Sequence, residues 1–247
     1  MRGFQKLTLV QAKLYLREPM AAFFTLAFGP FLLTLLGLIF GNKPDPIYGG
    51  LGFLDISVPA YMAMIIGIVG LTAVPISSAL RRETGVLRRF SATPLHPLTY
   101  FLTDLLVPFA MTLLGLLLLF LVGKLVFKVN FQGNLLSLFA GISLGALAFF
   151  SLGYALVGLI PSARAVIVIG NIVLYPLVIF SGATVPLQVM PAAVGTISRF
   201  LPLTHLVVLL RGLWFGQGWG DFLTEVAVLA GMAIVGIIIV VWTFRWE

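Results

Sequence analysis

The sequence predicts an all-α integral membrane protein with six transmembrane helices and both chain termini in the cytoplasm. Of its 247 residues, 60% are hydrophobic and only 9% are charged, whereas a soluble domain carries about 25% charged residues. The chain also contains long stretches without Asp, Glu, Lys or Arg, and about 20 apolar residues are enough to cross the hydrocarbon core of a bilayer. This composition excludes a disordered chain, a nucleic-acid-binding domain and an ordinary cytosolic enzyme.

Six charge-free stretches are long enough to span the membrane. We expect helices near residues 20–41, 56–80, 104–123, 135–160, 165–186 and 224–244. A membrane β-barrel is excluded because its strands alternate apolar and polar residues, which the run LLGLLLLFLVG at 113–123 does not do. Residues 201–215 are apolar but short and contain Arg211, so we expect an interfacial or re-entrant helix there.

The distribution of basic residues predicts the orientation. The formal charge is +7, and in so apolar a chain we attribute it to topology rather than to binding of nucleic acid. With the N-terminus inside, ten of the 15 Lys and Arg residues lie on the cytoplasmic side: Arg2, Lys6, Lys13, Arg17, Arg81, Arg82, Arg88, Arg89, Arg164 and Arg245.

Residues 1–18 precede the first span and favour an amphipathic helix at the membrane surface. Leu7, Val10 and Leu14 recur on one side, and Lys6, Lys13 and Arg17 gather on the other, so the helix would lie along the anionic cytoplasmic leaflet. A basic flank that only sets topology is an alternative. We expect residues 1–247 to form a single membrane domain whose longest outer segment is 187–223.

The chain offers little material for catalysis. It has no cysteine, no metal-ligand cluster, no phosphate-binding loop, and no intramembrane acids beyond Asp104 and Glu225, which we place at the two interfaces. We therefore predict no catalytic residue and no metal site. Four polar residues of the fifth span could line a substrate pathway: Asn171, Tyr175, Ser181 and Thr184. The alternative is that they only form hydrogen bonds between helices.

The most informative stretch is the cytoplasmic segment 81–98, a charged elbow with two prolines that could dock a partner or merely set topology. It carries an acidic residue, a glycine, a basic pair and a Thr-Pro pair: Glu83, Gly85, Arg88, Arg89, Thr93 and Pro94. A second pattern near the C-terminus consists of Pro186, Met190-Pro191, Pro202-Leu203-Thr204 and Leu210-Arg211-Gly212. In both patterns and in its six-span plan the chain resembles the ABC type-2 permeases, the membrane subunits of ABC exporters.

The resemblance implies roles for three segments. Segment 81–98 is similar to the coupling helix that docks on the cytoplasmic ATPase, and residues 1–18 are similar to the connecting helix. Segment 187–223, with Pro186, Pro191, Pro202 and Arg211, resembles the re-entrant outer helices that cap the pathway. The resemblance also implies a cell-membrane complex of two permease copies with two ATPases, typical of prokaryotes. Cofactors are expected only in the partner, as ATP and Mg, with none in this chain.

These implications make an ATP-driven exporter subunit for a hydrophobic or amphipathic substrate, such as a drug, antibiotic or lipid, the preferred function. Export of a polysaccharide or lipid-linked glycan is one alternative, since the aromatic residues Phe149, Phe150, Tyr154 and Tyr175 leave a sugar pathway open. A non-transporting sensor or assembly protein on the same scaffold is another. A membrane-embedded enzyme would need ionisable groups gathered at one depth, which the sequence does not provide.

Overall fold

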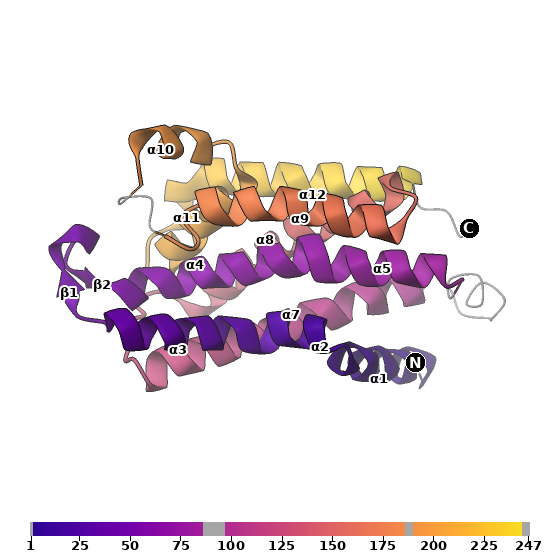
Figure 1. Ribbon diagram of the computed structural model, residues 1–247, viewed down its shortest axis with the longest axis horizontal. Helices are drawn as coiled ribbons and strands as arrows, with labels where there is room; N and C mark the ends of the chain where they lie inside the picture. Colours follow the sequence, from indigo (N-terminus) through magenta and orange to yellow (C-terminus); the bar gives the residue numbers. More distant parts are fainter. Residues whose placement is uncertain (1, 86–96, 186–189, 244–247) are drawn as a thin grey trace.

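Six helices of membrane-spanning length run side by side in the computed structural model, which describes residues 2–85, 97–185 and 190–243 (Figure 1). Helix α1 (Arg2–Arg17) lies at one end of the bundle, here called the α1 end. A short hairpin of β1 (Pro44–Asp45) and β2 (Leu51–Gly52) lies at the opposite end, here called the hairpin end. Helix α10 (Ala192–Ser198) also lies at the hairpin end.

The six predicted spans are confirmed within the described residues. The first consists of α2 (Pro19–Ala22), η1 (Phe23–Ala27) and α3 (Phe28–Phe40), and the second of α4 (Phe53–Ile68), η3 (Val69–Ala73) and α5 (Val74–Glu83). The others are α7 (Pro97–Leu125), α8 (Leu135–Leu159), α9 (Ala163–Phe180) and α12 (Leu223–Thr243), the last preceded by the turn η5 (Trp219–Phe222). The start of α1 and the end of α12 lie at the same end of the bundle, as an even number of spans requires (Figure 1).

Several predicted boundaries differ from the structure. Helix α7 begins at Pro97 instead of 104, and two other differences have local causes. The second span begins at Phe53, before the expected residue 56, because the carboxylate of Asp55 is buried and satisfied locally. It accepts hydrogen bonds from the backbone N–H groups of Gly52 and Asn130 and from the side chain of Asn42. The fifth span ends at Phe180 instead of 186 because Gly182 turns the chain in a left-handed conformation, with φ of 79°.

The first and second spans each contain a π-helical turn shortly before a proline. Turn η1 (Phe23–Ala27) precedes Pro30, and turn η3 (Val69–Ala73) precedes Pro75. A proline inside a helix removes one backbone hydrogen bond and clashes with the preceding turn, and a π-helical turn widens the helix at that point. The prolines therefore alter helix geometry locally without ending the spans.

Helix α4–α5 forms the centre of the bundle. Of its 18 most apolar consecutive residues, 67% are buried, whereas only 22% are buried in the corresponding parts of the first and last spans. Helices that are apolar all round belong either in a protein core or against lipid. The second span lies in the protein core. The first and last spans expose apolar side chains on the outside of the bundle.

Helix α1 is confirmed as a helix, but its bundle-facing side was not predicted. Tyr15 and Gln11 are buried toward α7, while Val10 and Leu14 are more than half exposed. Tyr15 also forms a 2.6 Å hydrogen bond with Thr25 of the first span. The predicted apolar stripe therefore faces away from the protein, where a bilayer surface would cover it.

The segment 187–223 contains two helices at the hairpin end, α10 and α11 (Pro202–Trp214). Helix α11 packs into the bundle, with Leu206, Leu210 and Leu213 almost fully buried. Gly145 of α8 allows this approach, since a Cβ there would lie 2.4 Å from Leu206. Packing between α8 and α11 of one chain therefore explains the glycine at position 145, and no contact with a second permease copy is needed to explain it.

Candidate functional site

The last turn of α5 brings three charged residues, Arg81, Arg82 and Glu83, to the α1 end of the bundle. Gly85 then ends the helix in a left-handed conformation with φ of 67°, and its N–H donates to the carbonyl of Arg82. This is a common way to close a helix C-terminus. The three charged residues therefore lie directly before residues 86–96 in the chain. The predicted coupling residues Arg88, Arg89, Thr93 and Pro94 lie outside the described residues.

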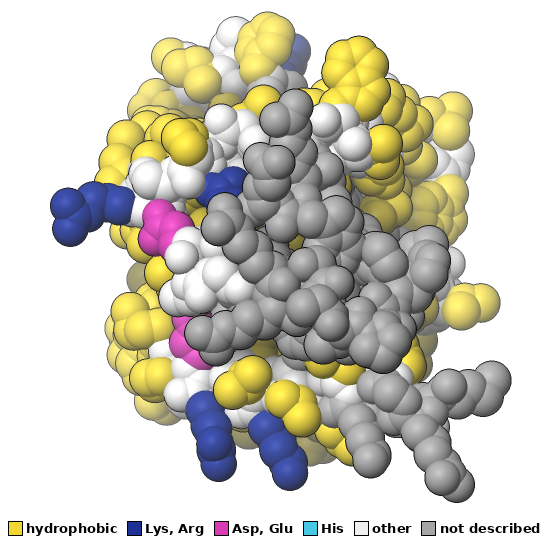
Figure 2. All heavy atoms as spheres, turned by 90° about the vertical axis from the view of Figure 1, so that its right-hand side faces the viewer, with side chains coloured by type: hydrophobic (Ala, Val, Ile, Leu, Met, Phe, Trp, Pro, Cys, Tyr) yellow, Lys and Arg dark blue, Asp and Glu magenta, His cyan; other side chains and the backbone are white. Residues whose placement is uncertain are grey.

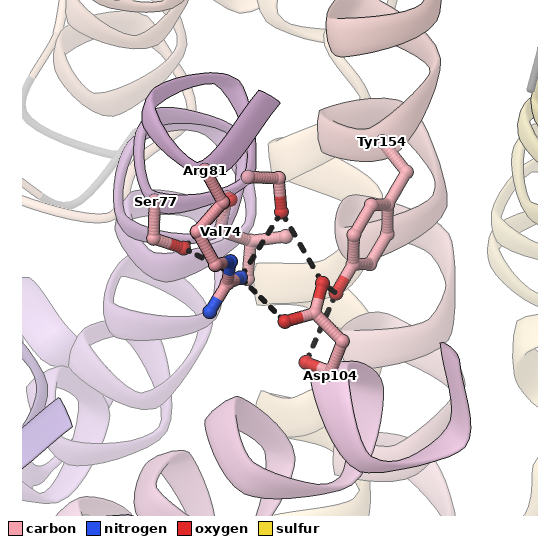
Figure 3. A network of polar contacts seen from close by, with 6 residues as sticks. Val74, Ser77, Arg81, Asp104 and Tyr154 are labelled. Carbon is pink, nitrogen blue, oxygen red and sulfur yellow. Dashed lines mark hydrogen bonds and ion pairs between the residues drawn. The ribbon is translucent and has the colours of Figure 1, made fainter. Parts of the chain in front are cut away.

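Arg81 forms an ion pair with Asp104 near the start of the third span (Figure 3). The side chain of Asp104 is only 6% exposed, whereas that of Arg81 is 29% exposed. Tyr154 of α8 donates its hydroxyl hydrogen at 3.1 Å from the Asp104 carboxylate, and its oxygen also lies 3.0 Å from the Asp104 carbonyl. Ser78 of α5 completes the cluster at 3.4 Å from the same carboxylate. The network thus joins α5, α7 and α8.

Arg82 and Glu83 hold the turn between α8 and α9. The guanidinium of Arg82 donates to three carbonyl oxygens, those of Val157, Ile160 and Pro161, the last two at 2.6 and 2.8 Å. Carbonyls at a helix C-terminus carry partial negative charge and attract a cation. The Glu83 carboxylate accepts the N–H of Ala163, the first residue of α9, at 2.5 Å. Each side chain therefore neutralises one helix end across this turn.

These contacts make the last turn of α5 a junction that reaches all three helices around it, α7, α8 and α9. We call the five residues Arg81, Arg82, Glu83, Asp104 and Tyr154 the junction. A charge inside a membrane-spanning segment is costly unless it is paired, and Asp104 is paired in full. Figure 2 looks onto this end, where Lys and Arg side chains project at the edge beside Asp or Glu side chains.

The sequence prediction identified part of this junction. Glu83 and Gly85 were singled out, and the structure shows that Glu83 contacts α9 while Gly85 ends α5. The interfacial depth of Asp104 stays a prediction, and the sequence did not predict that its side chain is buried against Arg81. Its position just inside a span was the available signal, because an acid there calls for a cation at the same depth.

The four pathway candidates of the fifth span do not share one environment. Asn171 is half-buried and Tyr175 is 61% exposed, one helical turn apart on α9. Ser181 is buried and accepts from the N–H of Ala183, and Thr184 donates to the carbonyl of Val178. The first two lie on the surface of the chain, while the last two stabilise the end of α9.

The candidates for the outer cap lie at the hairpin end. Pro191 precedes α10 and Pro202 opens α11, positions that suit a residue without an N–H. Arg211 lies in the last turn of α11, and Pro186 lies outside the described residues. Glu225, at the start of α12, faces His205 of α11 at 3.9 Å.

The six apolar helices of spanning length are those of a multi-pass membrane protein. The family model described as "ABC-2 type transporter" matches residues 2–215, and the chain belongs to this family. Permeases of this family normally pair with an ABC ATPase. The match covers the first five spans and the junction, and it ends before α12.

Two kinds of relative are similar to the chain in sequence. Inner membrane transport permease YhhJ of Escherichia coli (strain K12) is 30% identical over 178 residues, which are 68% of this chain and 47% of YhhJ. Nodulation protein J of Rhizobium leguminosarum bv. trifolii is 36% identical over 88 residues, which are 36% of this chain and 34% of that protein. The chain therefore matches less than half the length of either relative.

Proposed function

We propose that the chain is the membrane subunit of an ATP-driven exporter, with its α1 end in the cytoplasm and an ABC ATPase docked on segment 81–98. The observation that carries the proposal is the junction. It ties the start of this segment to α7, α8 and α9 through Arg81, Arg82 and Glu83. Family membership supports the partner, and the excess of basic residues on the α1 side supports the orientation.

The connection explains how movement of a partner would reach the membrane. Segment 86–96 leaves α5 at Gly85 and enters α7 at Pro97, so a force applied to it acts on the ends of both helices. The Arg81–Asp104 pair holds those ends together, and Glu83 extends the connection to α9. Packed elements joined in this way shift as discrete units. On this proposal Glu83 acts inside the chain as a positioning residue.

ATP would drive the cycle through the partner. A ligand shifts an equilibrium only by binding one state more tightly than the other, so closure of the ATPases around ATP and Mg must favour one position of the junction. We place the substrate between α9 and a second permease copy. Asn171 and Tyr175 on the surface of α9 would offer it an amide and a hydroxyl beside apolar side chains. Segment 187–223 would cap that path.

An amphipathic substrate fits this surface better than a glycan does. Of the four aromatic residues that favour a sugar pathway, Phe149 and Phe150 are buried and Tyr154 is bonded to Asp104. Tyr175 alone of these four is largely exposed. A hydrophobic drug, antibiotic or lipid therefore remains the proposed substrate class.

The test is to co-express the chain with an ABC ATPase encoded beside its gene and to measure complex formation and dye uptake into inside-out vesicles. We expect a two-plus-two complex that takes up an amphipathic dye when ATP is added. Glu83→Ala should leave the complex assembled but lower uptake per ATP hydrolysed. Asp221→Asn, which changes an exposed carboxylate at the other end of the bundle, is the matched control and should behave like the wild type.

Three outcomes would count against the proposal. Unchanged dye uptake per ATP hydrolysed in Glu83→Ala would show that the junction does not couple ATP hydrolysis to transport. Glycan uptake without dye uptake would replace the substrate class. Association with an ATPase but no transport of either would favour a sensor or assembly protein.

A further inference from the structure

A cavity of about 530 Å³ lies at the hairpin end, between the β1–β2 hairpin, α11 and η5. Its lining residues come from two stretches of the chain that are distant in sequence, 48–56 and 208–222. They are Tyr48, Gly49, Leu51, Ile56, Val208, Arg211, Gly212, Phe215, Gln217 and Phe222. The hairpin and α11, which line the cavity, lie at the opposite end of the bundle from the last turn of α5 (Figure 1).

One wall of the cavity carries a cation that forms no ion pair with any of the described residues. Arg211 is half-buried, and its Nε is buried without any hydrogen-bond partner among the described residues. None of the residues that line the cavity is acidic. A buried cation is normally paired with an anion or an array of acceptors, so the site is electrostatically incomplete.

The position of Arg211 in α11 explains only in part why an unpaired cation lies here. Arg211 lies in the last turn of α11, where the helix dipole favours a cation. Arg82 shows what such a role looks like when it is complete, since its guanidinium donates to carbonyls at the end of α8. The Arg211 side chain makes no such bond in the described part of the chain, so its hydrogen-bond donors are available to a ligand.

The remaining walls have a different character. Ile56 and Phe222 are almost fully buried and, with Val208 and Leu51, form an apolar surface. Tyr48 and Gln217 add a hydroxyl and an amide to the rim. A single cation beside an apolar wall matches a ligand with an anionic group joined to a hydrophobic chain.

We propose that this cavity binds the anionic head group of an amphiphile, with the Arg211 guanidinium as the anion contact and the apolar wall holding the start of its hydrophobic chain. Guanidinium groups bind phosphate and carboxylate oxygens through two parallel hydrogen bonds, and Arg211 has an unused donor for this purpose. The proposal rests on the cavity alone and does not depend on transport or on an ATPase.

The experiment uses the full chain, purified in a neutral detergent and stripped of lipid. Dioleoylphosphatidylglycerol, dioleoylphosphatidylcholine and inorganic phosphate are titrated separately, and binding is followed by the thermal midpoint and by native mass spectrometry. We expect saturable binding of one phosphatidylglycerol per chain, and weaker binding of the other two probes. Arg211→Gln should weaken phosphatidylglycerol binding by at least about tenfold, the loss expected for one charge-assisted hydrogen bond.

Two further variants make the result specific. Arg199→Gln removes an exposed cation at the same end and should bind phosphatidylglycerol like the wild type. Gln217→Glu places a carboxylate in the cavity lining, where it would supply the missing counter-ion and compete with the lipid. It therefore tests the site without removing Arg211, should Arg211→Gln fail to fold.

Equal affinity for phosphatidylcholine and phosphatidylglycerol would overturn the proposal. Inorganic phosphate binding as tightly as phosphatidylglycerol would replace the amphiphile by a free anion and would equally overturn it. Unchanged phosphatidylglycerol affinity in Gln217→Glu, or an equal loss in Arg199→Gln, would show that the lipid binds elsewhere.

Discussion

Arg81 in the last turns of α5 and Asp104 on α7 form an ion pair that joins these two helices. The pair is reinforced by Tyr154, which donates to Asp104 from α8. A residue pair at this position determines how the second and third spans meet at the α1 end. It also makes Asp104 dependent on Arg81, since the Asp104 side chain is only 6% exposed.

Replacing Asp104 with Leu should destabilise the protein by about 2 to 4 kcal/mol. Breaking a buried ion pair costs about 3 to 5 kcal/mol because one charge is left without a partner, and the 29% exposure of Arg81 lowers this cost. Adding Arg81→Met to Asp104→Leu should restore much of the loss. Chemical unfolding in detergent measures both variants, and a double variant no more stable than Asp104→Leu would contradict the interpretation.

Replacing Gly153 with Ala should separate α8 from the π-helical turn η3. A Cβ at this position would lie 2.0 Å from the carbonyl oxygen of Gly70 and 3.1 Å from Cδ of Pro75. Backbone must move to relieve such a contact, so we expect a loss of about 1 to 3 kcal/mol. Gly231→Ala on α12 meets no atom within 4 Å and is the matched control. Equal thermal midpoints for the two variants would rule out this close approach.

The attachment of α1 should weaken at high pH through Tyr15. Burial raises the pKa of Tyr15 from 10.0 to about 12, because the phenolate would lie in an apolar site beside Thr25. The folded state therefore holds this proton more tightly than the unfolded state. The corresponding stability is complete below pH 10 and declines as the pH rises from 10 to about 12.

Limited proteolysis between α1 and α2 as a function of pH measures this effect. Cleavage of the wild type should increase above pH 10, whereas Tyr15→Phe, which has no proton to lose, should lack that step. Lys13→Gln changes an exposed residue of the same helix and serves as the control. The same alkaline step in Tyr15→Phe would assign the transition to another group.

Local patterns in the sequence were sufficient for the six spans and for the helical nature of residues 2–17. Crossing a bilayer requires a certain length of apolar chain, and that length is a property of one segment read in isolation. The family patterns were equally local, since they consist of neighbouring residues such as Glu83 and Gly85.

Tertiary structure alone decided the pairing of charges. The sequence could not place Asp104 against Arg81 and Tyr154, Glu83 on the first N–H of α9, or Arg211 beside an apolar cavity. Each of these contacts depends on the relative depth and rotation of helices that are far apart in the chain. That geometry is determined by packing among side chains of the whole bundle, so it becomes visible only when all the helices are assembled.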